Sequence, residues 1–533
     1  MKIRPRAIAL STLALAATTG LGGAQEAHDH SAAKHQLGRV TFPNSCNARA
    51  KPTVEQGVAM LHSFWFEQAQ RTFEQAATDD PACAMANWGV AMTLLGNPFT
   101  GQEPPEPRLE AALAAAERAT ALGASATPRE RDYIAAALAL YRDPQTVDFR
   151  TRMRAHETLL RAAYERNPGD DEASIFYARA VIANAPPNDL TFARQKYAAS
   201  ILEPLFARFP QHPGLAHYLI HAHDAPAMAS RGLDAARRYA SIAPDAPHAL
   251  HMPSHIFTRL GYWDESIETN RRSQAAEPNP SAAVHPMDYM VYAFLQQGRD
   301  EDARAVVTQA VELPDRFYGG VVGYNFTAMP ARYTLERGRW AEAADLTAPT
   351  GALPFVEAVT RFARAIGAAR SGRLPQARTE VAALQALRDT LQMRKDSYWA
   401  TIVGAQRLAA AAWVARGEGK SDSAVRLARE AAELEETVEK HPVTPGPLLP
   451  ARELLGDLLL ELDRPADALA AYEKALEREP NRARSLYGAA RAAERARSDA
   501  VARKRYTELL ELMRRADATR EEPRLARAFL AAR

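Results

Sequence analysis

Histidine is concentrated in one short stretch of this sequence. Eight of the 14 histidines in the 533-residue chain lie between residues 212 and 285. Two pairs there share an HxxxH spacing, and their equivalent members are 34 residues apart: His217 and His221, then His251 and His255. Residues four apart on a helix share one face, with Cβ atoms about 5–6 Å apart. Each pair can therefore present two imidazoles to one metal ion.

The common register of the two pairs predicts that they converge. Neighbouring helix axes lie about 8–10 Å apart, so the four imidazoles can reach one transition metal such as zinc or copper. Asp224 is a further candidate, either as a ligand or as the acceptor of an imidazole N–H. The same residues also suit a metal-free patch that recognises a carboxylate or a peptide, or packing against neighbouring aromatic side chains. The sequence leaves these three interpretations open.

The 34-residue spacing extends beyond the histidines and indicates how they are positioned. A small residue is followed by a small residue at +12, an aromatic residue at +16, a small residue at +19 and a proline at +24. This pattern is found at Gly57, Ala69, Phe73, Ala76 and Pro81, and again at Gly456, Ala468, Tyr472, Ala475 and Pro480. Ser254, Ser266, Ser273 and Pro278 keep the same offsets. Small residues allow two helices to approach closely, and the proline ends the second helix.

These positions resemble the tetratricopeptide repeat, a helix–turn–helix unit with a period of 34 residues. The resemblance is clearest at 449–482, 247–280 and 50–83, and we expect eight to eleven repeats over most of 53–518. It implies an all-α fold, a right-handed superhelical solenoid in which each repeat buries its apolar stripe against its neighbours. The alanine-rich, glycine-poor composition also favours helix.

The resemblance also implies a ligand-binding face. In the family, positions 2, 5, 9 and 12 of the first helix line the concave groove. With repeats starting at Pro213 and Pro247, the candidate ligand-binding residues are His217, His221, Asp224, His248, His251 and His255. His223 falls between helices instead, and the direction of His285 is left open because the repeat before it is about three residues longer.

The ends of the chain and its proline-rich segments divide it into five parts. Lys2, Arg4 and Arg6, a short apolar run and small residues at 22–24 predict a secretory signal peptide over 1–24. An irregular segment, 25–52, precedes the solenoid at 53–440, and a proline-rich linker, 441–450, precedes C-terminal repeats at 451–533. The prolines between 97 and 108 predict a loop, either a surface connection or a flap over the groove. We expect an exported protein of the bacterial type, periplasmic or secreted, with no membrane span after signal removal.

The two cysteines are expected to form a disulfide. Cys46 lies just before the first predicted helix, and Cys83 opens the helix after the first repeat. First helices of successive repeats run in the same direction, so both cysteines lie at one end of the stack. An exported chain meets an oxidising compartment, where closing a loop of about 37 residues would contribute about 3–4 kcal/mol.

Composition and missing motifs narrow the function. The net charge of +2 gives no argument for a nucleic-acid partner. There is no glycine-rich phosphate loop, no GxSxG and no HExxH, so we expect no enzymatic activity. The preferred interpretation is an exported scaffold whose groove binds a protein segment or a small ligand through the histidine patch. The alternative is a His-ligated metal-binding protein, or a metal-dependent hydrolase built on that groove. The sequence does not indicate the ligand or the oligomeric state.

Overall fold

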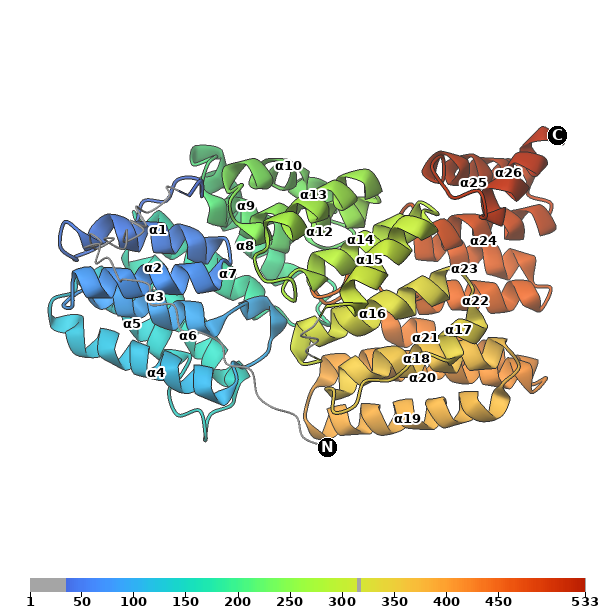
Figure 1. The fold of residues 1–533 in the computed structure, drawn as a ribbon, viewed down its shortest axis with the longest axis horizontal. Helices are drawn as coiled ribbons and strands as arrows, with labels where there is room; N and C mark the ends of the chain where they lie inside the picture. The colour runs from blue at the N-terminus through green and yellow to red at the C-terminus, as the bar shows by residue number, and fades with distance from the viewer. Residues whose placement is uncertain (1–34, 314–317, 533) are drawn as a thin grey trace, which may run out of the picture. The chain divides into compact units, whose positions relative to one another are not determined.

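Helices follow one another along almost the whole described chain (Figure 1). The computed structural model describes residues 35–313 and 318–532, and no β-strand occurs in these ranges. The expected signal peptide at 1–24 and residues 25–34 lie outside them. The first elements are α1 (Ala50–His62), α2 (Phe66–Asp79), α3 (Ala84–Leu95), η1 (Pro98–Thr100), α4 (Glu106–Ala121), η2 (Leu122–Ala124), α5 (Pro128–Ala139), α6 (Phe149–Arg166), α7 (Asp171–Ala183), α8 (Ala193–Arg208), α9 (Pro213–His223), η3 (Ala229–Gly232) and α10 (Leu233–Ile242).

The remaining elements continue the same alternation of helix and short connection. They are α11 (Pro247–His251), α12 (Pro253–Leu260), α13 (Trp263–Ala276), α14 (Val284–Gln296), α15 (Asp300–Val311), α16 (Gly320–Glu336), α17 (Trp340–Ala344), α18 (Pro354–Arg370), α19 (Leu374–Met393), α20 (Ser397–Gly417), α21 (Ser421–Glu435), α22 (Ala451–Glu461), α23 (Pro465–Arg478), α24 (Ala483–Arg495), α25 (Asp499–Leu512) and α26 (Glu521–Ala531). None of the described helices is long and apolar enough to cross a membrane.

The helices stack as a solenoid. Consecutive helices pack as hairpins, and helices two places apart also pack, as in α1 with α3, α18 with α20, α20 with α22 and α22 with α24. This is the arrangement of a repeat array, in which each unit buries its apolar face against its neighbours. The prediction of an all-α solenoid of tetratricopeptide-like helical hairpins is confirmed for the described residues.

The small residues of the repeat pattern allow close helix packing near both ends of the solenoid, as predicted. The Phe73 ring of α2 lies between α1 and α3, where a Cβ on Gly57 or Gly89 would lie 2.7 or 2.2 Å from ring atoms. The Tyr472 ring of α23 is enclosed in the same way by Gly456 and Gly488, with distances of 2.8 and 2.3 Å. A side chain at any of these glycines would push the two helices apart.

The N-terminal segment is irregular, as expected, and is bound to the helices beside it. The Gln36 N–H donates to Asp245, and the Arg39 N–H donates to the Gln211 carbonyl. Cys46 and Cys83 form a disulfide with a Cα–Cα distance of 4.8 Å. The bond joins this segment to the residue before α3.

The proline-rich segment 441–450 is not helical, but it is not a free connection either. Most of it is buried, and it runs against α14 and α16. Arg332 of α16 donates to the carbonyl oxygens of Gly446 and Pro447, both at 2.8 Å, and pairs with Asp288 of α14 at 2.9 Å. Proline cannot donate a backbone hydrogen bond, so a buried arginine supplies the donors for the carbonyl groups of this stretch. The expectation of a linker is corrected to a buried part of the solenoid.

Removing the disulfide should destabilise the N-terminal repeats. We expect Cys46→Ser/Cys83→Ser to lower the free energy of unfolding by about 3–4 kcal/mol, because the unfolded chain regains the freedom of the open loop. Serine at 83 keeps an acceptor for the Ala86 N–H that the Cys83 sulfur now binds. Denaturant unfolding with and without reductant measures the effect. Reductant should weaken the wild type and leave the variant unchanged; equal stability of the two proteins would contradict the prediction.

Glu435 should make stability fall as pH rises. Burial raises its pKa to about 7, although its carboxylate accepts from the Ala451 N–H. A carboxyl group whose pKa is higher in the folded than in the unfolded state stabilises the fold below about pH 4.5, and this contribution is lost as pH rises through about 7.

The test is Glu435→Gln, which is neutral at every pH. The variant should be more stable than the wild type at pH 8, by about 2 kcal/mol after allowance for partial solvation of the side chain. The difference should vanish at pH 5. Thermal unfolding at both values measures it, and a difference independent of pH would show that the group does not titrate in this range.

Candidate metal centre

Three successive helical hairpins carry the histidine cluster. His217 and His221 lie on α9, His248 and His251 on α11, and His255 on α12. Pro253 begins α12 directly after α11, and Met252 between the two helices keeps helical backbone angles. His285 lies on the first turn of α14 and enters the cluster, which settles the direction that the sequence left open.

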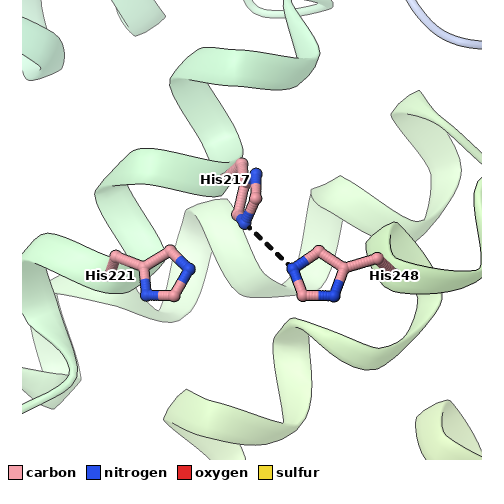
Figure 2. Close-up of side chains that lie close together, drawn as sticks. All are labelled: His217, His221 and His248. Atoms are coloured by element: carbon pink, nitrogen blue, oxygen red, sulfur yellow. Dashed lines mark hydrogen bonds between the residues drawn. The ribbon is translucent and has the colours of Figure 1, made fainter. Parts of the chain in front are cut away.

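The histidines group into two triads. In each triad one ring nitrogen of every histidine lies within 4.8 Å of the others: the first is His217, His221 and His248, and the second is His251, His255 and His285. Figure 2 shows the first triad, with each ring presenting a nitrogen to the same small space. The triads are adjacent, because the rings of His221 and His255 are 5.8 Å apart between centroids.

The predicted grouping is therefore corrected. The sequence placed His217, His221, His251 and His255 around one ion, but each HxxxH pair instead takes a third histidine of its own. The reason is the geometry of the stack, in which successive first helices present their side chains side by side along the array rather than around one point. His248 was predicted as a ligand-binding residue but not as a metal ligand.

The second triad contains two lone pairs that face each other. His251 Nδ1 lies 2.6 Å from Asn270 Oδ1, and the Asn270 amide is oriented by its own donation to the Ser266 carbonyl. His255 Nδ1 lies 2.9 Å from Asp224 Oδ2. Both partners are acceptors, so both imidazoles carry their proton on Nδ1. Their Nε2 atoms are then unprotonated, and they lie only 3.1 Å apart.

The first triad is built in a similar way. His217 Nδ1 donates to the His62 carbonyl at 2.6 Å, which leaves Nε2 as an acceptor. His248 Nε2 lies 3.2 Å from that atom. His221 Nε2 is buried and has no hydrogen-bond partner among the described residues. A buried nitrogen without a partner is costly, and a metal ion in the shared space would bind it.

Asp224 connects the second triad to a buried group of charges. Its carboxylate accepts from His255, from Arg259 Nε at 2.8 Å and from Lys440 Nζ at 3.0 Å. Arg259 also pairs with Glu439 at 2.8 Å. Burial alone would raise the pKa of Asp224, but Lys440 and Arg259 outweigh it and hold the pKa well below its usual range. Asp224 is therefore a charged acceptor that orients His255, which was one of the two roles predicted for it.

The imidazoles are held neutral by their surroundings. Burial is the main cause that lowers the pKa values of all six histidines, and neighbouring imidazoles lower those of His217, His221, His248, His251 and His285 further. For His255, the bond to Asp224 offsets part of this effect. Neutral imidazole is the form that binds a metal.

The cluster does not form an open groove surface. His217, His251 and His255 are at most 1% exposed, and His221 is 8% exposed. His248 and His285 are partly exposed, so the cluster is largely but not wholly enclosed. Recognition of a ligand by this patch stays a prediction. His221 and Asp224 do line a cavity of about 700 Å³.

A third group, which the sequence analysis missed, is of a different kind. Glu172 of α7 accepts from His62 at 2.9 Å and from His212 at 2.8 Å, and His62 Nδ1 lies 3.0 Å from the Tyr218 hydroxyl. Every member of this group has a partner, so it needs no ion. His62 and Glu172 lie outside the histidine-rich stretch in sequence, and the packing of α1 and α7 against α9 brings them there.

The structure also places His223 and the loop between 97 and 108. His223 points away from both triads and pairs with Glu203 of α8 at 3.1 Å. The loop expected between 97 and 108 contains η1, and its Phe99 ring lies 4.0 Å from the His221 ring between centroids. The loop therefore packs against one histidine of the first triad.

No protein-family model matches the chain, and no curated protein matches it. Solved structures with similar arrangements include yeast Tom70, with 12% identity, coverage of 91% of this chain and 95% of that one, and a TM-score of 0.35. Human IFIT1, solved as a dimer with PPP-AAAA, has 12% identity, coverage of 86% and 89%, and a TM-score of 0.38. A Naa15/Naa10 complex bound to HypK-THB has 12% identity, coverage of 87% and 70%, and a TM-score of 0.24. At such TM-scores these likenesses carry no argument about function.

Proposed function

We propose that the protein binds transition-metal ions at the paired histidine triads, one ion in each. The observation that carries this proposal is the pair of unprotonated Nε2 atoms of His251 and His255, 3.1 Å apart in a buried site. Two lone pairs at this distance repel each other unless a cation lies beside them. A shared proton would bind only two of the ring nitrogens, whereas one metal ion could be coordinated by all three nitrogens of a triad.

The surroundings of the triads support a metal rather than packing alone. Metal-bound histidines characteristically donate their second N–H to a carboxylate or carbonyl acceptor, which sets the ring orientation. Asp224, the Asn270 side chain and the His62 carbonyl provide such acceptors for His255, His251 and His217. All-imidazole sites suit zinc, copper and nickel. We therefore favour the metal-binding alternative over direct recognition of a protein segment by the histidines.

Export belongs to the same proposal. The N-terminal signal pattern predicts a periplasmic or secreted protein, and the Cys46–Cys83 disulfide suits an oxidising compartment. A protein partner on the outer or inner faces of the solenoid is compatible with metal binding, because the ions would be enclosed beneath the surface.

Metal analysis of the full-length, untagged protein tests the proposal. We expect two equivalents of zinc after equilibration and dialysis. His251→Ala/His255→Ala should retain one equivalent, because it removes two of the three ligands of a single triad. His223→Gln is the matched control: it removes a histidine from the same region that lies outside both triads. Absence of zinc in the wild type, or equal content in wild type and double variant, would disprove the assignment.

Asn270 should control affinity without being a ligand. Asn270→Ala removes the acceptor that holds the proton of His251 on Nδ1, so we expect zinc affinity at the second triad to fall about 10–100-fold. Competition with a chromophoric chelator measures this loss. The first triad should keep its affinity, and circular dichroism should show that the helices are retained. A uniform loss at both sites would indicate disturbed packing instead.

A further inference from the structure

A cavity beside the histidine cluster is formed by segments far apart in the sequence. Its walls come from the 98–102 loop, the start of α6, the loop before α8, the start of α20 and the 439–442 segment, together with His221 and Asp224. Its volume is about 700 Å³, in the range of sites for small organic molecules.

The cavity reaches one triad and not the other. Of the six triad histidines, only His221 lines it. The Nε2 atom of this residue is buried and has no hydrogen-bond partner among the described residues, and it faces His217 and His248 (Figure 2). Gln195 Oε1, a second buried atom with no hydrogen-bond partner in the described part of the chain, also belongs to the lining residues. No histidine of the second triad lines the cavity.

The walls combine aromatic rings with positive charge. Phe99, Phe192 and Trp399 contribute rings. The carboxylates of Asp224 and Glu439 are already paired with Arg259 and Lys440. Four cationic side chains of the lining form no ion pair with described residues: Arg150, Arg154, Arg394 and Lys395. Asp189 and Asp396 are the other acidic residues of the lining, so positive charge is in excess.

We propose that this cavity binds a small organic anion with an aromatic or other apolar body, whose carboxylate takes the open coordination position of the ion held by His217, His221 and His248. The inference rests on the proposed metal site. A three-histidine zinc site keeps a further position for water or another ligand. The excess positive charge attracts an anion, the rings cover its apolar body, and His221 marks the place where it meets the ion.

Phe99 lies beside His221 and also lines the cavity. Its ring lies over His221, in a loop flanked by Gly96 and Gly101, both at positive φ (71° and 65°). Backbone of this kind is adopted readily by glycine. The loop thereby places the Phe99 ring, which also lines the cavity, against His221.

The test uses the full-length protein loaded with Co²⁺, whose visible absorption reports its coordination, and benzoate as the probe. We expect benzoate to change the absorption of one of the two bound ions. Acetate should require a higher concentration because it lacks the ring, and benzylammonium should have no effect because it carries the opposite charge. Arg150→Ala/Arg154→Ala should bind benzoate about fivefold more weakly. The matched control is Arg161→Ala on the same helix, which pairs with Glu165 and does not line the cavity.

The outcomes separate the two proposals. If no Co²⁺ binds, the metal site is disproved and this inference falls with it. If two Co²⁺ ions bind and benzoate leaves their absorption unchanged, only the cavity assignment is overturned. The assignment is also overturned if benzoate acts in the His217→Ala/His248→Ala protein, since the affected ion would then belong to the second triad. Equal benzoate affinity in the Arg150/Arg154 variant and the Arg161 control would disprove the proposed role of the positive charge.

Discussion

A buried imidazole that donates its only proton to a fixed acceptor must present its other nitrogen as a bare lone pair, and the histidine cluster depends on this constraint. The three acceptors are a carboxylate, a backbone carbonyl, and an amide oxygen whose orientation is set by a second hydrogen bond. None of them can donate a hydrogen bond to the imidazole. Each therefore determines the tautomer of its histidine. Once the tautomers are set, the distance between His251 and His255 cannot be explained by a hydrogen bond between neutral rings. A metal ion beside the two nitrogens, or a proton shared between them, would account for it.

The three acceptors differ in how far they lie in sequence from the histidines that they orient. Asn270 belongs to the second helix of the same repeat as His251, so the hairpin alone brings them together. Asp224 is the residue that ends α9, and it meets His255 of the following repeat. The His62 carbonyl comes from the end of α1, which contacts α9 across many intervening helices. The orientation of His217 therefore depends on the curvature of the array, and the orientation of His251 does not.

This difference explains how much of the site the sequence could predict. The 34-residue register correctly indicated the helical hairpins, the pairing of Cys46 with Cys83 and the presence of His217, His221, His251 and His255 on neighbouring helices. It did not indicate that His248 and His285 complete two separate triads, because the side-by-side arrangement of successive helices depends on packing. It also could not show that the cluster is buried. The 98–102 loop and the 439–442 segment, which contact His221 and Asp224, approach from distant parts of the chain and carry no repeat pattern.

The proline-rich segment has a larger role than its composition suggests. It is preceded by Glu439 and Lys440, which join the Arg259–Asp224 charges, and its own carbonyl groups are bound by Arg332. The segment thereby connects the acceptor of His255 to α16, a helix that contributes no histidine. A chain without regular structure is suited to this position, since its backbone carbonyls and flanking charges face several helices at once. Because Lys440 and Arg259 keep Asp224 ionised, the second triad has a charged acceptor behind it, whereas His217 of the first has only a neutral carbonyl. The two triads thus differ in the acceptors that orient their histidines, although all their ligands are imidazoles.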